Sequence, residues 1–397
     1  NIEELLEVDP LNHFARFEKY ILNPSPARLN DFKSLIRNEF PHETYLELAI
    51  DYVNRGLYDE ALKVLEEAPS NPIVLYWLAW LNKDTDNDKC TQFLQKAMDF
   101  SPFLVFPFRH ETIGVLEWAL EMDDSWKTRY YLGLIYWHIK RPEKAMELLI
   151  ECGNALDYAP FYIARGILSQ SVNGNSLTQG NDFAKALELD LSEWRSWHFM
   201  AENLQSDMLY SDQLIKTRQA YLRFPSNPVV GIDYAKALIN NGKYAECLKI
   251  LENITILPQE GAHEGHDLYE LANLSIAVDM IEQGKFNQAI RYIDASKKWP
   301  ENLGAGKPYE PDIRFQDYLS AFCHKMTGKN DISEDYFNRI LEYSLKNWKG
   351  GGDPVSICIS NMIFEKAGKH DLAIRAMEKW KNDQDSLKIW SISAGSQ

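Results

Sequence analysis

The chain has 397 residues, of which 45% are hydrophobic and 25% charged, and its 58 acidic and 42 basic residues give a formal net charge of -16. This length allows several compact domains or one extended repeat array, and either can bury a large core. The acidic surplus disfavours binding to nucleic-acid phosphates or to anionic membrane surfaces. The sequence therefore predicts neither a nucleic-acid partner nor a membrane partner.

The chain begins at Asn1 rather than at a methionine, and no apolar run approaches the roughly 18–20 residues of a membrane-spanning helix. We interpret it as a segment of a longer protein, so that any targeting signal would precede Asn1. The five cysteines are far apart and form no CxxC pair, which indicates neither a disulfide framework nor a zinc site. Cysteine usage slightly favours the cytoplasm, but the sequence does not fix the localisation.

Apolar residues recur at helical spacing through most of the chain, and strand-like alternation is nearly absent. Glycines and prolines interrupt this pattern every 12 residues or so, which predicts helix hairpins joined by short turns. We expect a helical pair in an N-terminal cap over residues 1–41. Residues 42–390 then predict a continuous array of hairpins, and residues 391–397 form a tail.

The segment YLELAIDYVNRGLYDEALKVL (residues 45–65) shows the repeated unit. A first helix carries large and aromatic residues around the small Ala49, Gly56 follows at a turn, and a second helix carries the small Ala61. This order resembles the tetratricopeptide repeat (TPR), and related patterns recur further along the chain. Gly133, Ala201 and Ala235 are separated by two periods and then one period of 34 residues, the length of that repeat.

The TPR resemblance implies an all-α fold, an α–α superhelix (solenoid) of nine or ten hairpins with a right-handed turn. It also implies a non-enzymatic scaffold that binds a protein or peptide partner. Small residues are needed where the two helices of a hairpin approach each other, and Cys90 and Cys247 occupy the same place in the pattern as Ala61. We therefore expect both thiols to be core residues. No pattern indicates catalytic residues, a cofactor or a metal.

Four segments interrupt the period, at residues 102–125, 257–269, 299–313 and 347–353. Each follows the second helix of a hairpin, so we expect all four to project from the same edge of the array, which is often a binding face. Candidate partner-binding residues in these segments are Arg109, Glu260, His263, His266, Trp299 and Lys307. The alternative is that their prolines and glycines only shape long turns while Trp299 covers the core.

Two strings in these segments resemble known motifs without matching them. The histidines of HEGH (263–266) are three residues apart, whereas a zinc-binding helix needs them four apart. LGAGKPY (303–309) has Pro308 where a phosphate-binding loop needs serine or threonine. The sequence therefore predicts neither a metal site nor a nucleotide site.

The first helices of the central repeats should line a concave groove. The residues that the period turns inward are Lys127, Tyr130, Trp137, His138, Arg165, Arg195, His198, Glu202, Asp233 and Lys236. Four of them are basic in a strongly acidic chain, which favours a carboxylate-bearing ligand or an acidic partner. The alternative is an ordinary solvated helix face.

The strings FPFR (106–109), APFYIAR (159–165), WRSW (194–197) and WPENLGAGKPY (299–309) are similar to the C-terminal repeat region of large bacterial proteins of unknown function. The front half of those proteins resembles a galactose-mutarotase-like β-sandwich. This resemblance implies an alternative function, a carbohydrate-binding or carbohydrate-enzyme-associated accessory region. Sugar-stacking indoles must be exposed, so the accessibility of Trp137, Trp194, Trp197 and Trp299 separates the two functions.

Overall fold

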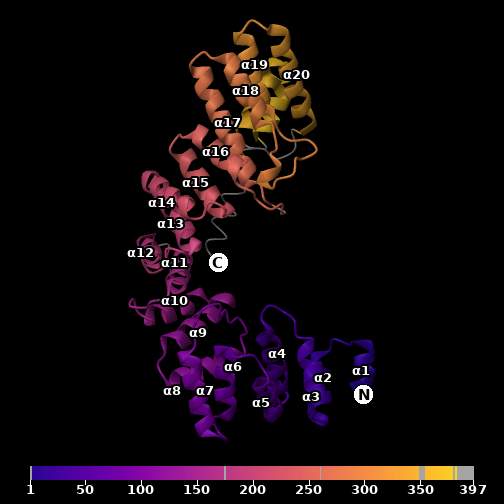
Figure 1. Ribbon diagram of the computed structural model, residues 1–397. Helices are drawn as coiled ribbons and strands as arrows, with labels where there is room; N and C mark the ends of the chain where they lie inside the picture. The colour runs from indigo at the N-terminus through magenta and orange to yellow at the C-terminus, as the bar shows by residue number, and fades with distance from the viewer. Residues whose placement is uncertain (1, 174–175, 260, 348–353, 379–380, 382–397) are drawn as a thin grey trace. The chain divides into compact units, whose positions relative to one another are not determined.

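The computed structural model describes residues 2–173, 176–259, 261–347, 354–378 and 381. Within these ranges the regular structure is helical and includes no β-strand, which confirms the predicted all-α class (Figure 1). Contacts divide the chain into two compact units, Asn1–Asp190 and Leu191–Gln397. No helix in the described ranges has both the length and the hydropathy to cross a membrane.

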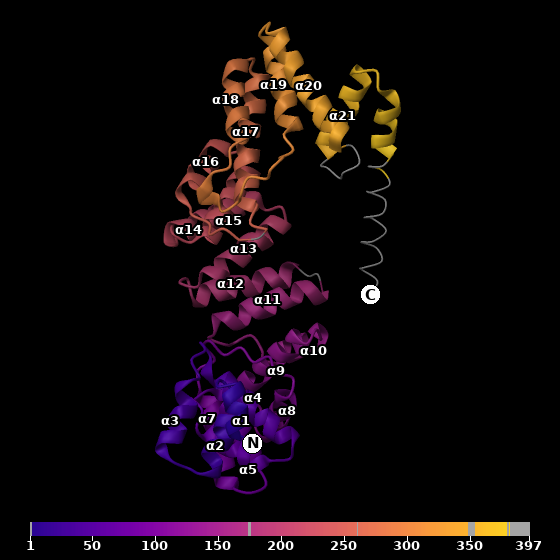
Figure 2. The same cartoon turned by 90° about the vertical axis from the view of Figure 1, so that its right-hand side faces the viewer.

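The helices of the first unit follow one another with short connections. They are α1 (Ile2–Val8), α2 (His13–Leu22), α3 (Pro26–Ser34), α4 (Pro41–Asn54), α5 (Tyr58–Glu66), α6 (Pro72–Asn82), α7 (Asn87–Asp99), α8 (Thr112–Met122), α9 (Trp126–His138), α10 (Pro142–Glu151), α11 (Ala159–Asn173) and α12 (Ser176–Leu189). Most of them pair with the next helix as hairpins, namely α2/α3, α4/α5, α6/α7, α9/α10 and α11/α12 (Figures 1 and 2).

The second unit continues the same pattern. Its helices are α13 (Trp194–Ser206), α14 (Tyr210–Arg223), α15 (Pro228–Asn240), α16 (Tyr244–Asn253), α17 (Glu264–Glu282), α18 (Phe286–Ser296), the 3₁₀ helix η1 (Glu301–Leu303), α19 (Arg314–Met326), α20 (Asn330–Asn347) and α21 (Pro354–Lys366). Residues 370–378 are also helical. Helices α13 to α20 form four successive hairpins, and the first helix α15 contacts both α13 and α17 (Figure 2). This stacking confirms the predicted solenoid of helix hairpins.

The turn between the helices of a hairpin has the same geometry in seven described repeats. One residue adopts φ between 58° and 77°, and these residues are Gly56, Lys140, Met208, Gly242, Gly284, Gly328 and Gly368. After Gly56 the amide of Leu57 donates to the carbonyl of Tyr52 at 2.9 Å, which closes the end of α4. Glycine adopts this conformation without strain, whereas Lys140 and Met208 do so at a cost of about 1 kcal/mol.

The structure corrects the predicted boundaries in three places. The segment 102–125 is not a single loop, because residues 112–122 form α8, which buries Val115 and Leu116 and contacts α6 and α9. The segment 257–269 becomes helical at Glu264, where acidic residues in the first turn favour the start of α17. An additional helix, α1, precedes the predicted N-terminal pair. Residues 348–353 and the tail 391–397 lie outside the described residues.

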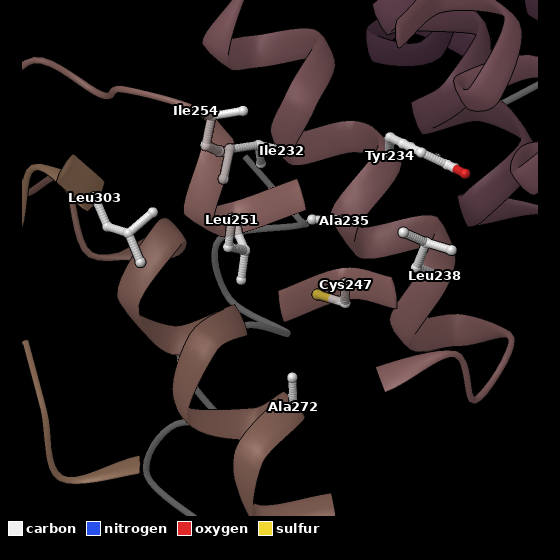
Figure 3. Close-up of a cluster of buried hydrophobic side chains, with 9 residues drawn as sticks. All are labelled: Ile232, Tyr234, Ala235, Leu238, Cys247, Leu251, Ile254, Ala272 and Leu303. Carbon is white, nitrogen blue, oxygen red and sulfur yellow. The ribbon is translucent and has the colours of Figure 1, made fainter. Parts of the chain in front are cut away.

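A core cluster around α15 supports the site described below. Its buried residues are Ile232, Tyr234, Ala235, Leu238, Cys247, Leu251, Ile254, Ala272 and Leu303 (Figure 3). Leu303 comes from η1 and belongs to the same cluster as Leu251 of α16, so the segment after α18 packs on an earlier hairpin. A Cβ at Gly231 would be 2.6 Å from Cγ2 of Ile254, so the absence of a side chain there lets the segment after α16 lie directly on α15.

Candidate functional site

The candidate site is a pocket of about 480 Å³ in the second unit, which we call the α15 pocket. Its walls come from α13, α15, the segment between α16 and α17, and the first turn of α17. The polar lining residues used below are His198, Glu202, Asp233, Lys236 and Glu264. The apolar lining residues are Pro228, Val229, Ile232, Ile256, Leu257 and Ala262.

An imidazole–carboxylate pair forms one wall of the pocket. Nδ1 of His198 lies 2.8 Å from Oδ2 of Asp233, which joins the first helices of two successive hairpins. Asp233 is 4% exposed, and Nε2 of His198 lies 3.6 Å from Oε1 of Glu202, one turn further along α13. The buried carboxylate therefore fixes the orientation of the ring and leaves the other ring nitrogen facing the more exposed Glu202.

The surroundings of His198 shift its protonation equilibrium. Burial lowers the pKa of the imidazole, but the hydrogen bond and negative charge of Asp233, helped by Glu202, outweigh burial. The net pKa lies above the ordinary value of 6.5, and the nearby Lys236 opposes this shift only weakly. His198 thus holds a proton to higher pH than an exposed histidine would.

The opposite wall carries a second ion pair. Nζ of Lys236 lies 2.6 Å from Oε1 of Glu264, which ties α15 to the first turn of α17. Three carboxylates therefore line the pocket against one lysine and one histidine. This balance does not provide the surplus of positive charge that the sequence predicted for the groove.

The apolar side of the pocket is held by contacts between two of the predicted loop segments. The amide of Ile256 donates to the carbonyl of Asn302 at 2.8 Å, and the side-chain amide of Asn302 donates to the carbonyls of Leu251 and Ile254. A Cβ at Gly265 would lie 2.7 Å from Cδ1 of Ile256. Residues 254–257 are therefore clamped between α15, α17 and η1, which presents Leu257 at the mouth of the pocket.

Two residues predicted for the loop edge form a structural contact beside the pocket. The rings of His266 and Trp299 stack with centroids 3.5 Å apart and an interplanar angle of 14°. His266 is buried, and burial lowers its pKa against the opposing charge of Asp267. His266 and Trp299 therefore join the start of α17 to the segment after α18, and the buried imidazole is not accessible to a partner.

The structure brings only part of the predicted groove together. His198, Glu202, Asp233 and Lys236 all line the α15 pocket. Arg165 does not act as a groove residue, because it is 7% exposed and its guanidinium donates to both carboxylate oxygens of Asp182 at 2.6 and 3.0 Å. Arg165 does lie on the first helix of its hairpin, as the repeat period predicts, but Asp182 on α12, the second helix of the same hairpin, neutralises its charge. The prediction that Arg165 offers a free positive charge is wrong.

The groove residues of α9 are also engaged within the chain. Nζ of Lys127 donates to the carbonyls of Met98 and Phe100 at 2.7 Å each, which leaves it no role as a free cation. Tyr130 is buried among aromatic rings that include Trp126 and is not a surface residue. Trp137 is half-buried, and the exposed His138 lies against the ring of Phe108 at 5.8 Å between centroids.

The remaining predicted residues are dispersed. Arg195 is exposed, pairs with Glu193 at 3.1 Å and covers the ring of Trp194. Arg109 donates to Glu43 at 2.8 Å in the first unit. His263 and Lys307 are exposed, and Glu260 lies outside the described residues.

The indoles that would carry the carbohydrate hypothesis differ in accessibility. Trp197 is buried and donates its Nε1 hydrogen to the carbonyl of Leu191, so it cannot stack on a sugar. One face of Trp299 is covered by His266. Trp137 and Trp194 stay half-exposed, so the carbohydrate role remains a prediction.

Cys90 and Cys247 are both buried, which confirms their prediction as core residues. Burial raises the pKa of the Cys247 thiol to about 12, so it stays protonated and unreactive. Within the described ranges, no group of three or more histidine, cysteine, aspartate or glutamate side chains has the arrangement of a metal site.

Sequence reasoning missed the apolar half of the pocket. Leu257 is 79% exposed, and it lines the pocket together with Val229 and Ile232 of α15. The sequence carries one usable signal, because the predicted insertion opens with Leu257, directly after Ile256, rather than with polar residues. An apolar start to a loop indicates either a core contact or an exposed contact surface. Here the half-buried Ile256 makes the core contact, and the exposed Leu257 provides the surface.

No protein-family model matches the chain, and no curated protein matches it. Among solved structures, it is similar to a tetratricopeptide repeat protein from Parabacteroides merdae, with 14% identity, a TM-score of 0.33, and coverage of 74% of this chain and 98% of that one. It is also similar to PilF of Pseudomonas aeruginosa, with 16% identity, a TM-score of 0.33, and coverage of 55% of this chain and 91% of that one. A thermophilic TPR protein of Thermus thermophilus has 19% identity, a TM-score of 0.30, and coverage of 50% of this chain and 99% of that one.

These identities and TM-scores are low, so they say nothing about partners or activity. The repeat architecture is visible in the described residues themselves. Seven of the described hairpins share a turn residue with positive φ, and the small residues Ala61, Gly133 and Ala289 are buried within their hairpins. The described residues form a helical array of hairpins that resemble tetratricopeptide repeats.

Proposed function

We propose that this protein is a non-enzymatic scaffold that binds a peptide segment of another protein in the α15 pocket. The observation that carries the proposal is convergence: two first helices, a clamped loop and the start of a third first helix contribute to one pocket of about 480 Å³. Pockets for extended ligands commonly combine an apolar floor with a few oriented polar groups.

The chemistry of the lining supports a particular kind of ligand. Leu257, Val229 and Ile232 offer an apolar surface for one anchoring side chain. Asp233 orients His198, and Glu264 holds Lys236, so the polar groups are fixed before the ligand arrives. Preorganised groups lower the entropy cost of binding. Because carboxylates outnumber cations here, the charge balance favours an uncharged or cationic group beside the anchor, not the carboxylate expected from the sequence.

The proposal is tested by selecting binders from a random peptide library displayed on phage, with the purified chain as bait. An enriched peptide is resynthesised with a photoreactive residue at its apolar anchor and cross-linked to the protein. We expect the cross-linked peptides, identified by mass spectrometry, to include residues 228–236 or 254–259. These segments hold the apolar lining of the pocket.

A parallel experiment with the Glu202→Lys variant checks the polar rim. This exposed residue faces His198 from the same helix, and its reversal should weaken a peptide whose polar group is cationic. Cross-links confined to second helices such as α14 and α16, or no enrichment of any peptide, would contradict the proposal.

A further inference from the structure

The segment between α7 and α8 exposes an unusual amount of apolar surface. We call residues 100–109 the strap. Phe103 is 66% exposed, Phe106 61% and Phe108 41%, whereas Val105 and Pro107 between them are buried. This alternation means that the buried residues attach the strap to the first unit while the phenylalanines face outward.

The strap is fixed along α9 rather than projecting freely. At its start, Nζ of Lys127 holds the carbonyl of Phe100 and the hydroxyl of Tyr158 donates to the carbonyl of Pro102 at 3.0 Å. At its end, the ring of Phe108 lies against His138. Lys127 and His138 occupy opposite ends of α9, so the strap follows the length of that helix.

The backbone of the strap contains a strained residue. Leu104 has φ of 58° and is 54% exposed, so the left-handed conformation turns a leucine toward solvent. A leucine pays about 1 kcal/mol for this conformation. Residues held in such conformations are concentrated at functional surfaces.

The strap ends at a second pocket, which has a volume of about 530 Å³ and lies within the first unit. Glu47, Asp51 and Glu111 line it, and Arg109 is the one arginine or lysine among its lining residues. The guanidinium of Arg109 is occupied by Glu43 at 2.8 Å and by Glu47 at 3.6 Å. An exposed aromatic strip therefore leads directly into a pocket with a negative surplus.

We propose that the strap and this acidic pocket form a second partner surface, independent of the α15 pocket. Its occupant is a polypeptide segment that carries apolar side chains next to lysine or arginine. The phenylalanines would supply the apolar contact, and Glu47, Asp51 and Glu111 would attract the cation by charge complementarity.

A membrane is the other surface that exposed phenylalanines can contact. The chain carries a net charge of -16, and the acidic groups beside the strap repel anionic lipid headgroups. The same charges attract a basic polypeptide. The observations thus favour a protein partner, and lipid binding becomes one outcome of the test.

The test uses a random peptide library displayed on phage, selected on the wild-type chain and depleted on a Phe106→Ser/Glu47→Lys double variant. We expect the surviving peptides to place leucine, phenylalanine or another apolar residue beside lysine or arginine. Fluorescence anisotropy of one such peptide should show about tenfold weaker binding to each single variant. Added salt should weaken the contribution of Glu47 but not that of Phe106.

Two control variants lie outside the proposed surface. Tyr309→Ser removes an aromatic ring that is 98% exposed in the second unit, and Glu282→Lys reverses an exposed acidic residue on α17. Both should bind the peptide as the wild type does, and circular dichroism should show all four single variants equally helical.

Three results would overturn the proposal. The first is a set of enriched peptides without basic residues, and the second is equal binding by wild type and the Phe106→Ser variant. The third is a combination of two findings: no peptide is enriched, and the chain sediments with zwitterionic phosphatidylcholine vesicles only when Phe106 is present. The strap would then be a lipid-contacting element instead.

Discussion

The face of the first helices differs between the two units of the molecule. In the first unit the strap covers the predicted groove side of α9 and engages Lys127 and His138. In the second unit the corresponding residues of α13 and α15 line an open pocket. The repeat period predicts which residues face the groove, but an insertion elsewhere in the chain decides whether that face stays accessible.

The ion pairs of the two predicted groove residues Arg165 and His198 also differ between the units: one pair is enclosed within a hairpin, and the other stays at the groove face. Arg165 binds Asp182 on the second helix of its own hairpin, which buries both charges inside the repeat. His198 binds Asp233 on the next first helix, which keeps the pair at the groove face. The position of the carboxylate therefore separates a structural ion pair from one that can meet a ligand.

The strongest way to test this difference is Asp182→Ala. Loss of the carboxylate leaves the guanidinium of Arg165 buried without a counterion, so the free energy of unfolding should fall by about 3–5 kcal/mol. Urea denaturation followed by circular dichroism measures the change. The matched control is Glu188→Ala on the same helix, which removes an exposed pair with Lys185 and should change stability by less than about 1 kcal/mol. Equal effects of the two substitutions would show that the buried pair has no special structural role.

Gly133→Leu tests the packing of the hairpin beneath the strap. A Cβ at this position would lie 3.1 Å from Cδ2 of Leu149, so a larger side chain should overpack the α9–α10 contact and cost about 1–3 kcal/mol of stability. Gly114→Leu on α8 is the control, because nothing lies within 4 Å of its Cβ position. Denaturation midpoints of the two variants give the comparison. An unchanged midpoint for Gly133→Leu would show that Gly133 does not lie at the α9–α10 contact.

Lys127→Met tests whether Lys127 anchors the strap along α9. The substitution removes two hydrogen bonds to the carbonyls at the end of α7, which should cost about 1 kcal/mol, and it should expose the strap to chymotrypsin. Cleavage after Phe103 or Phe108 is followed by mass spectrometry under native conditions, because Pro107 blocks cleavage after Phe106. Lys185→Met on α12 removes a lysine outside the strap and should leave the cleavage rate unchanged. A strap that is cut equally fast in both variants is not anchored by Lys127.

The two histidines beside the α15 pocket should respond to pH in opposite directions. The pKa of His198 is raised in the folded state, so its stabilising contribution is complete below about pH 6.5 and is lost as the pH rises through the folded pKa. The pKa of His266 is lowered by burial, so its contribution is complete above about pH 6.5 and is lost as the pH falls.

Thermal melts near pH 5.5 and pH 8 measure these responses. His198→Gln should destabilise the chain more at the lower pH. His266→Phe, which keeps an aromatic ring on Trp299, should gain stability relative to wild type as the pH falls. The same pH response in both variants would contradict the assigned environments.

The sequence predicted the fold well because its signals are local. Turn glycines such as Gly56 and Gly242 and small contact residues such as Gly133 and Ala289 recur within each hairpin, and the structure has them at the expected turns and helix contacts. The site depended on contacts between distant segments, which periodicity does not report. Asn302 holds the carbonyl of Leu251, about fifty residues earlier, and this contact shapes one wall of the pocket.

The charge of the groove was mispredicted for a related reason. The repeat period identifies inward positions but not their hydrogen-bond acceptors, and three of the four basic groove residues have an acceptor that only the fold brings within reach. Lys127 finds backbone carbonyls of α7, Arg165 finds Asp182, and Lys236 finds Glu264. In an acidic chain, a basic residue at a repeat face usually forms an ion pair with a carboxylate of the same chain and is then not free to bind a ligand.

The most direct test of the open face in the second unit compares two leucines of similar exposure. Leu257 is 79% exposed at the mouth of the α15 pocket, and Leu222 is 74% exposed on the second helix α14. Both are changed to glutamate, and the affinity of a library-selected peptide is measured by fluorescence anisotropy. We expect Leu257→Glu to lower the affinity about tenfold or more and Leu222→Glu to leave it unchanged. Equal affinity of the two variants, with both still helical, would contradict the assignment of the α15 pocket as the binding site.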